Sequence, residues 1–135
     1  MDIAINPDGP ADPLYVLELA EAFAERPRAL AHLTRHHSAL GEPADADQLL
    51  RYLETAVSRL PQLLEQVSGW LAAEEAAGRI RMADGSGFPG PVVGVGAARG
   101  WLERAQADAN RLQRALDAAA QVTAQMAAVE DGSEG

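Results

Sequence analysis

The stretch that decides the fold spans residues 49–71 and reads LLRYLETAVSRLPQLLEQVSGWL. Its apolar residues recur in steps of four and three, which is the spacing of one face of an α-helix and close to a heptad seam. The steps keep their phase across Pro61, so the pattern predicts one long helix over about residues 46–77 that is kinked at this proline. The seam consists of Leu49, Leu53, Val57, Leu60, Leu64, Val67 and Leu71.

The residues on either side of this stretch predict where the helix begins and ends. Asp45 followed by Gln48 resembles a capping box, in which side chains satisfy backbone amides that have no partner inside the helix. Gly78 suits the position after the last turn, because glycine adopts the left-handed conformation that commonly ends helices. Upstream, Gly41 and Pro43 are expected to end the arm that comes before.

That earlier helical arm is predicted over about residues 13–40. Pro13 suits a first helical turn, with Asp12 as the N-cap. Apolar residues recur at helical spacing on both sides of a gap that contains Pro27. Because proline removes a backbone donor and clashes with the preceding turn, we expect this arm to break or kink near Arg26.

The last arm is predicted over about residues 97–129, after a loop at residues 79–96. Glycine and proline are frequent in that loop and disfavour a regular helix. The arm has apolar and small residues in alternating steps of four and three, which allow close approach to a neighbouring helix. They are Ala98, Leu102, Ala105, Ala109, Leu112, Leu116, Ala119, Thr123 and Met126.

Together the three arms predict an all-α protein, an antiparallel bundle of three long helical arms kinked at Pro27 and Pro61. We expect a single domain over residues 13–129, a flexible N-terminal arm at residues 1–12 and a disordered tail at residues 130–135. The leucines expected to form the core seam of this bundle are Leu53, Leu60, Leu64, Leu71, Leu102, Leu112 and Leu116.

The composition excludes several classes of function. The 135 residues contain no cysteine, which removes disulfides, thiolate metal sites and cysteine nucleophiles. The formal net charge of −9 argues against direct binding to nucleic acid, because affinity for phosphate comes mostly from cationic side chains. No apolar run approaches the ~18 residues of a membrane span, and no signal peptide is visible. We therefore expect a cytoplasmic protein that contacts neither nucleic acid nor membrane directly.

Aromatic residues are few, and their placement suggests a candidate interface. The tripeptide Gly-Trp-Leu occurs at residues 69–71 and again at residues 100–102. In an antiparallel bundle both copies are expected near the glycine-rich loop, together with two aromatic residues of the first arm. This pole is either a hydrophobic plug or a docking patch for a partner, since Trp and Tyr are favoured interface anchors. The interface candidates are Tyr15, Phe23, Trp70 and Trp101.

Two histidines of the first arm form a candidate metal site. His32 and His36 are four residues apart, so on a helix they share a face and suit a transition metal. The alternative is a polar helix end, where histidine favours the negative end of the helix dipole. No catalytic residue and no cofactor is predicted, because no nucleophile motif is present. The glycines at residues 85–90 match a dinucleotide fingerprint but lack the strand that must precede it.

Residues 58–64, SRLPQLL, and the following Gly-Trp-Leu at residues 69–71 carry a resemblance. This pattern is similar to that of small uncharacterised helical proteins of actinobacteria. The resemblance covers about residues 40–80. It implies no known activity and transfers no functional residues.

From these patterns we expect a non-enzymatic helical interaction or assembly protein. Its partner is expected to be itself, as a homo-oligomer joined through the Leu/Ala seams, or another helical protein. One alternative is a regulatory adaptor that acts on a partner bound to nucleic acid. Another is a helical bundle that binds a metal or small ligand at His32 and His36.

Overall fold

The computed structural model describes residues 12–130, and every regular element in that range is a helix. The all-α fold class predicted from the sequence is therefore confirmed. The chain forms two compact units, Met1–Gly41 and Glu42–Gly135. Apart from Asp12 and Glu130, the expected N-terminal arm and C-terminal tail lie outside the described residues. Within the described range, no helix is both long enough and apolar enough to cross a membrane.

The first unit contains helix α1, Pro13–Leu33. Pro13 is its first residue, and the amide of Tyr15 donates a hydrogen bond to Asp12 Oδ1 at 2.9 Å. Asp12 is therefore the N-cap, as the sequence predicted. The helix runs through Pro27 without interruption, so no break occurs there.

Helix α1 ends earlier than predicted. The Thr34 amide still donates to the Leu30 carbonyl at 2.9 Å, but the next two amides, of Arg35 and His36, reach back only three residues. The Thr34 hydroxyl also donates to the Leu30 carbonyl, at 2.7 Å, and so competes for the main-chain acceptors of the last turn. A short 3-10 helix, η1 (His37–Ala39), follows. The single helix predicted over residues 13–40 is therefore wrong at its C-terminal end.

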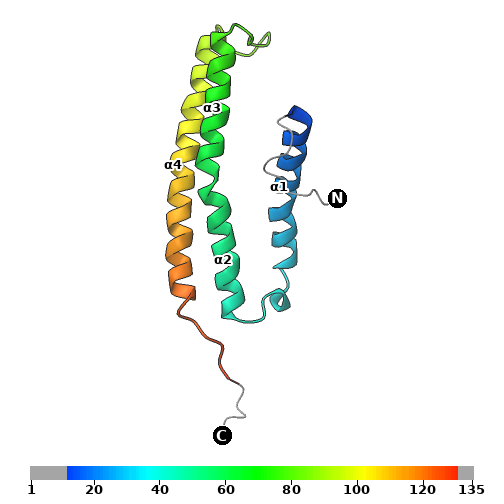
Figure 1. Cartoon of the computed structure of the whole chain (residues 1–135), viewed down its shortest axis with the longest axis vertical. Coiled ribbons are helices and arrows are strands. Elements are labelled where there is room, and N and C mark those ends of the chain that lie inside the picture. The colour runs from blue at the N-terminus through cyan, green and yellow to red at the C-terminus, as the bar shows by residue number, and fades with distance from the viewer. Residues whose placement is uncertain (1–11, 131–135) are drawn as a thin grey trace. The chain divides into compact units, whose positions relative to one another are not determined.

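The second unit is a helical hairpin. Two consecutive helices form one arm and a single helix forms the other (Figure 1). They are α2 (Pro43–Ser58) and α3 (Leu60–Ala76), which pack against α4 (Pro91–Thr123).

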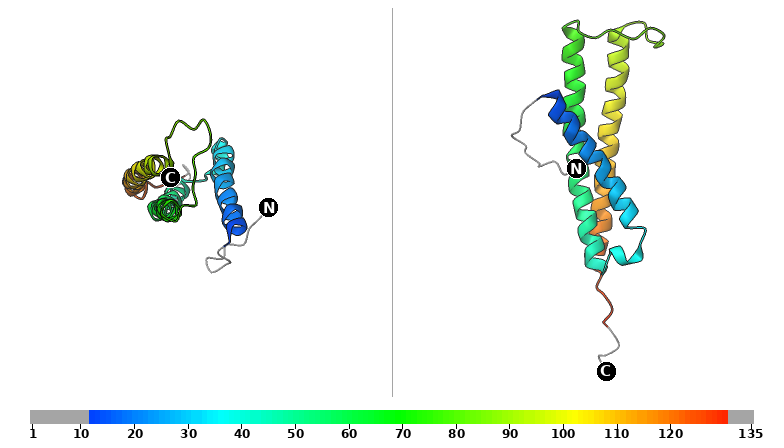
Figure 2. Two further views of the ribbon diagram at one scale, coloured as in Figure 1. Left: turned by 90° about the horizontal axis from the view of Figure 1, so that it is seen from above. Right: turned by 90° about the vertical axis from the view of Figure 1, so that its right-hand side faces the viewer.

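Polar contacts near both ends of the hairpin show that its arms are antiparallel. Near the connecting loop, Arg99 Nε donates to Ser68 Oγ at 2.9 Å. At the opposite end, the Thr123 hydroxyl donates to Asp47 Oδ1 at 2.7 Å. The start of α2 therefore lies beside the end of α4, as the right-hand view in Figure 2 also shows.

Helices α2 and α3 replace the single kinked helix predicted over residues 46–77. The α-helix is interrupted at Arg59. Pro61 has no amide hydrogen to donate to the Val57 carbonyl, and the Arg59 amide reaches back only to the Ala56 carbonyl, at 3.3 Å. The prediction of one continuous helix is wrong because the proline removes a hydrogen bond that would join the two halves.

Helix α2 also begins earlier than predicted. Glu42 is the N-cap, and its amide donates to Asp45 Oδ2 at 3.2 Å in a capping box. Pro43 therefore opens this helix and does not end the previous one. Its fixed φ and missing amide hydrogen suit the first turn, where the amide would have no intrahelical partner. The capping box predicted at Asp45 and Gln48 is one turn too late.

Helix α3 ends in the motif that the sequence predicted. Gly78 has φ of +72°, and its amide donates to the Glu75 carbonyl at 3.0 Å. The next amide, of Arg79, donates to the Glu74 carbonyl at 2.9 Å. These two bonds form a Schellman motif, so the role predicted for Gly78 is confirmed.

Helix α4 begins within the stretch predicted as a loop. Gly90 is its N-cap and Pro91 its first residue, so the predicted loop at residues 79–96 is wrong over its last six positions. Gly94 lets Met82 of the preceding loop pack closely against this helix, because a Cβ there would lie 2.5 Å from Met82 Sδ. The glycine therefore serves close packing and does not break the helix. At its other end, α4 stops at Thr123 and does not reach residue 129.

The buried core of the described residues is small. Three apolar residues, Val95, Ala109 and Ala120, are buried, together with Ser68. No large side chain in this range is fully buried. The hairpin is thus joined by small residues and half-buried leucines, with most of its larger apolar side chains partly in solvent.

Candidate interaction surface

Seven exposed apolar side chains lie along one stripe of each arm of the hairpin. Their exposed fractions range from 42% to 70%. We call this surface the tryptophan face, because it contains both tryptophans of the sequence. It consists of Tyr52, Leu63, Val67, Trp70, Trp101, Leu112 and Val122.

The phase of the helices explains why these side chains are exposed. Nearly every member directly precedes a buried or half-buried residue that is turned toward the opposite arm. One residue along an α-helix corresponds to a rotation of about 100°, so the face lies beside the packing seam of each arm. Examples are the pairs Leu63–Leu64, Val67–Ser68, Trp70–Leu71, Trp101–Leu102 and Val122–Thr123.

The stripes of the two arms lie on the same side of the hairpin. In each arm the stripe is displaced from the seam by one residue toward the N-terminus, and therefore by the same rotation about the helix axis. Because the arms run in opposite directions, equal rotations bring both stripes to the same side of the plane that contains the two axes. The tryptophan face is thus one surface built from both arms.

The opposite side of the hairpin is charged, with four carboxylates, two of which form ion pairs with Arg51. The residue directly after each of four seam leucines is a carboxylate, rotated by about 100° in the other sense. These four carboxylates are Glu54, Glu65, Glu103 and Asp117. An open hollow on this side is lined by Glu54, Asn110, Gln113, Arg114 and Asp117.

The tryptophan face carries two charged residues among its apolar ones. On the arm of α2 and α3, Arg59 is exposed and directly precedes a half-buried leucine. Between Trp101 and Val122, its stripe on α4 includes one ionisable residue, Asp108, which forms an ion pair with Arg111. The other positions of that stripe are alanines and one leucine. The hairpin therefore separates a mainly apolar side from a charged side that is rich in carboxylates.

Two of the four predicted interface residues belong to this face. Trp70 is 60% exposed and Trp101 is 70% exposed. Phe23 is exposed and Tyr15 is half-buried on α1. Since α1 belongs to the other unit, the gathering of all four residues at one pole stays a prediction. Sequence reasoning missed the remaining members of the face, because it followed the packing seam alone.

Of the seven leucines predicted to form the core seam, the structure exposes one, and it also exposes Val67 of the seam predicted over residues 49–71. Leu112 is 49% exposed and lies on the tryptophan face. After Ala109, α4 turns Gln113 and Ala120 toward the other arm, so the observed seam steps differ from the predicted ones by one residue. Both sets of steps fit a helix, so spacing alone did not separate them. The other six leucines are half-buried, namely Leu53, Leu60, Leu64, Leu71, Leu102 and Leu116.

The helical basis of the predicted metal pair is wrong. His32 lies in the last turn of α1, but His36 lies beyond the end of that helix, with extended backbone angles (φ −91°, ψ 126°). The two residues therefore do not share a helix face. Among residues 12–130, no three or more His, Cys, Asp or Glu side chains are grouped so that they would hold a metal ion.

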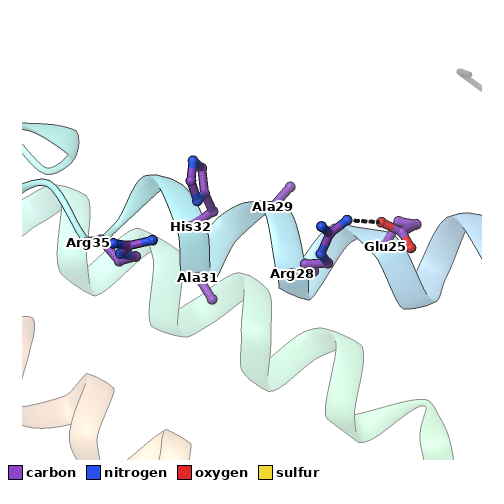
Figure 3. A pocket seen from close by; sticks show the side chains of 6 residues that line it. All are labelled: Glu25, Arg28, Ala29, Ala31, His32 and Arg35. Carbon is purple, nitrogen blue, oxygen red and sulfur yellow. Dashed lines mark hydrogen bonds and ion pairs between the residues drawn. The ribbon is translucent and has the colours of Figure 1, made fainter.

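His32 instead contributes to an open hollow along α1 (Figure 3). Arg28 Nη1 lies 3.2 Å from Glu25 Oε2 in this hollow, and both side chains are well exposed to water. An ion pair of this kind contributes little to stability. The residues that line the hollow are Glu25, Arg28, Ala29, Ala31, His32 and Arg35.

No protein-family model, no curated protein and no solved structure matches this chain. The two features of the hairpin that bear on function are its small core and the tryptophan face.

Proposed function

We propose that this chain is a non-enzymatic helical assembly protein that acts by self-association. The observation that carries the proposal is the imbalance between a core of small residues and an exposed apolar surface. Val95, Ala109 and Ala120 are the buried apolar residues of the described range, while the tryptophan face lies in solvent. Contiguous apolar patches on a protein surface typically mark interaction sites.

Association would recover the hydrophobic free energy that the isolated hairpin lacks. Burying apolar surface contributes about 25 cal/mol per Å², and one large side chain contributes about 1.5–3 kcal/mol when it is fully buried. Such contributions are large beside the 5–15 kcal/mol that stabilises a typical domain. A partner that covers the tryptophan face would therefore supply a substantial share of the stability.

The proposal includes the finer architecture expected from the sequence. In the assembled state, we expect the arm that contains α1 (Pro13–Leu33) to join the hairpin as the third member of an antiparallel bundle bent at Pro27 and Pro61, beside the surface that the partner covers. A cytoplasmic location is part of the same proposal, since a reducing compartment suits a chain without cysteine. The resemblance to actinobacterial helical proteins adds no activity to it.

The absolute mass of the protein in solution tests self-association. We would measure it by light scattering over a hundredfold range of protein concentration. A dimer or larger species supports the proposal. A strict monomer at every concentration contradicts it and directs the search to a different helical protein as partner.

Leu64→Asp tests whether the packing seam is needed for this fold. Leu64 is half-buried on the side of α3 that packs against α4. Placing a carboxylate there is expected to cost about 2–4 kcal/mol, because it replaces a half-buried leucine between two helices by a charge. Urea unfolding should show a lower midpoint, and the mass should fall. Gln66→Asp, at an exposed position in the middle of the same helix, is the matched control and should change neither quantity.

A further inference from the structure

We propose that the tryptophan face is covered by the same face of a second copy of this chain. The two hairpins would form a twofold-symmetric four-helix bundle in which every neighbouring pair of helices is antiparallel. This inference rests on the proposed self-association and specifies its surface and symmetry. Charge, area and shape support it independently.

Among the possible orientations of a second copy, charge favours this one. Each chain carries a net charge of −9, so two copies repel one another in most orientations. The carboxylates Glu54, Glu65 and Glu103 lie on the opposite side of the hairpin. When the tryptophan faces meet, these charged sides point outward, and water and salt screen their repulsion.

The area of the face is sufficient for a stable dimer. On α4 the face extends from Trp101 to Val122, which is about 32 Å at 1.5 Å per residue. Two packed helices have axes about 9 Å apart, so together they present a surface about 18 Å wide. The resulting ~570 Å² per chain, about 1,150 Å² over both copies, exceeds the ~1,000 Å² of total area expected of a specific interface.

The two stripes of the face are complementary in size. The stripe on α2 and α3 is bulky, with Tyr52, Leu63 and Trp70. The stripe on α4 is mostly small between its three large members. A twofold axis parallel to the helices sets the α3 of each copy against the α4 of the other, so that bulky side chains meet small ones. The small members of the α4 stripe are Ala98, Ala105, Ala115 and Ala119.

The register of the two arms within one hairpin indicates which bulky residue of one copy would lie opposite which small residue of the other. The hydrogen bond between Ser68 and Arg99 places Trp70 at about the level of Ala98. Residues that are level within one hairpin are also level across such a twofold axis. Trp70 would therefore meet Ala98 of the second copy. Counting along the helices gives two further level pairs, Leu63 with Ala105 and Tyr52 with Ala115.

Tryptophan fluorescence reports directly on this face, because the sequence contains two tryptophans and both belong to it. We would dilute the full chain while recording its mass by light scattering and its emission maximum. A dimer should emit at shorter wavelength than a monomer. The emission should shift to longer wavelength over the same concentration range in which the mass halves.

Single charges on the two sides of the hairpin locate the interface. Leu63→Glu and Trp101→Glu, both on the face, should each weaken the dimer by about thirtyfold or more, as expected for a central interface residue. Asn110→Glu adds the same charge at an exposed position on the charged side and should leave the dimer intact. Circular dichroism should show unchanged helix content in all three variants, since these side chains are exposed in the single chain.

Cross-linking tests the symmetry. The chain has no cysteine, so single cysteines can be placed freely. Ala56→Cys and Ala115→Cys are prepared separately, mixed, and treated with a short bis-maleimide. The arrangement predicts more covalent dimer in the mixture than in either preparation alone, because α2 of one copy lies beside α4 of the other.

The possible failures are distinguishable. A wild-type dimer that Leu63→Glu and Trp101→Glu leave intact would overturn this interface and retain self-association through another surface. A wild-type monomer with solvent-exposed tryptophans would overturn both proposals. A monomer with shielded tryptophans would show that the face is covered within one chain, and would also overturn both.

Discussion

At the residue scale, the best-defined polar contact joins Glu74 and Arg79 at the end of α3. Arg79 Nε and Nη2 donate to the two carboxylate oxygens of Glu74 at 2.8 and 3.0 Å. This hydrogen bonding, more than the attraction of the two charges, holds the pKa of Glu74 below its ordinary value and raises the pKa of Arg79. The Schellman motif fixes the geometry, because it folds Arg79 back over the last turn that carries Glu74.

Arg79→Gln should therefore raise the pKa of Glu74 toward that of a free glutamate. The sign follows from linkage, since a lowered carboxylate pKa stabilises the fold above the ordinary pKa. That contribution is lost as the pH falls through the lowered value. The carboxyl carbon shift of Glu74, followed by NMR through an acid titration, measures the change. Arg81→Gln, two residues further along, serves as control and should leave the Glu74 titration unmoved.

At the element scale, proline marks helix starts in this chain. Pro13, Pro43 and Pro91 are each the first residue of a helix, and Pro61 is the second residue of α3. The sequence predicted this role for Pro13 alone. A proline can either follow the end of one helix or stand in the first turn of the next. The presence of proline in the sequence therefore does not distinguish the two roles.

The glycines of α4 provide a matched pair of substitutions. A Cβ at Gly96 would meet nothing within 4 Å, so Gly96→Ala should stabilise the protein by about 0.5–1 kcal/mol through helix propensity. Gly94→Ala should gain less or lose stability, because it must displace Met82. Thermal unfolding of the two variants side by side should show a higher Tm for Gly96→Ala. Equal gains would mean that the Met82 contact has no role.

Helical periodicity predicted the number of long arms reliably. It predicted the residues at which the helices begin and end less well. The leucine steps identified the two arms of the hairpin, and Gly78 identified the end of α3. The interruption at Arg59 and the start at Pro91 depend on local backbone hydrogen bonding, which the spacing of apolar residues does not report. Of the candidate site, the two tryptophans were predicted, but the face they share depends on the antiparallel sense of the arms.

At the scale of the whole molecule, stability and association should be linked. If a second copy covers the tryptophan face, mass action favours the folded dimer as concentration rises. The Tm should therefore increase with protein concentration. Moderate salt should strengthen the dimer, because it screens repulsion between two chains of net charge −9. Differential scanning calorimetry at several concentrations and salt levels checks both, and a constant Tm would contradict the linkage.

The order of residues around the seam leucines has a consequence for protein engineering. Around Leu53, Leu64 and Leu102, an apolar residue comes before the leucine and a glutamate comes after it. Reversing these triplets exchanges the two sides of the hairpin and conserves composition, net charge and seam. Reversing the two triplets of one arm alone, through Tyr52→Glu with Glu54→Tyr and Leu63→Glu with Glu65→Leu, would instead divide the apolar surface between opposite sides. Two proteins with the same amino-acid composition would then differ in whether they self-associate.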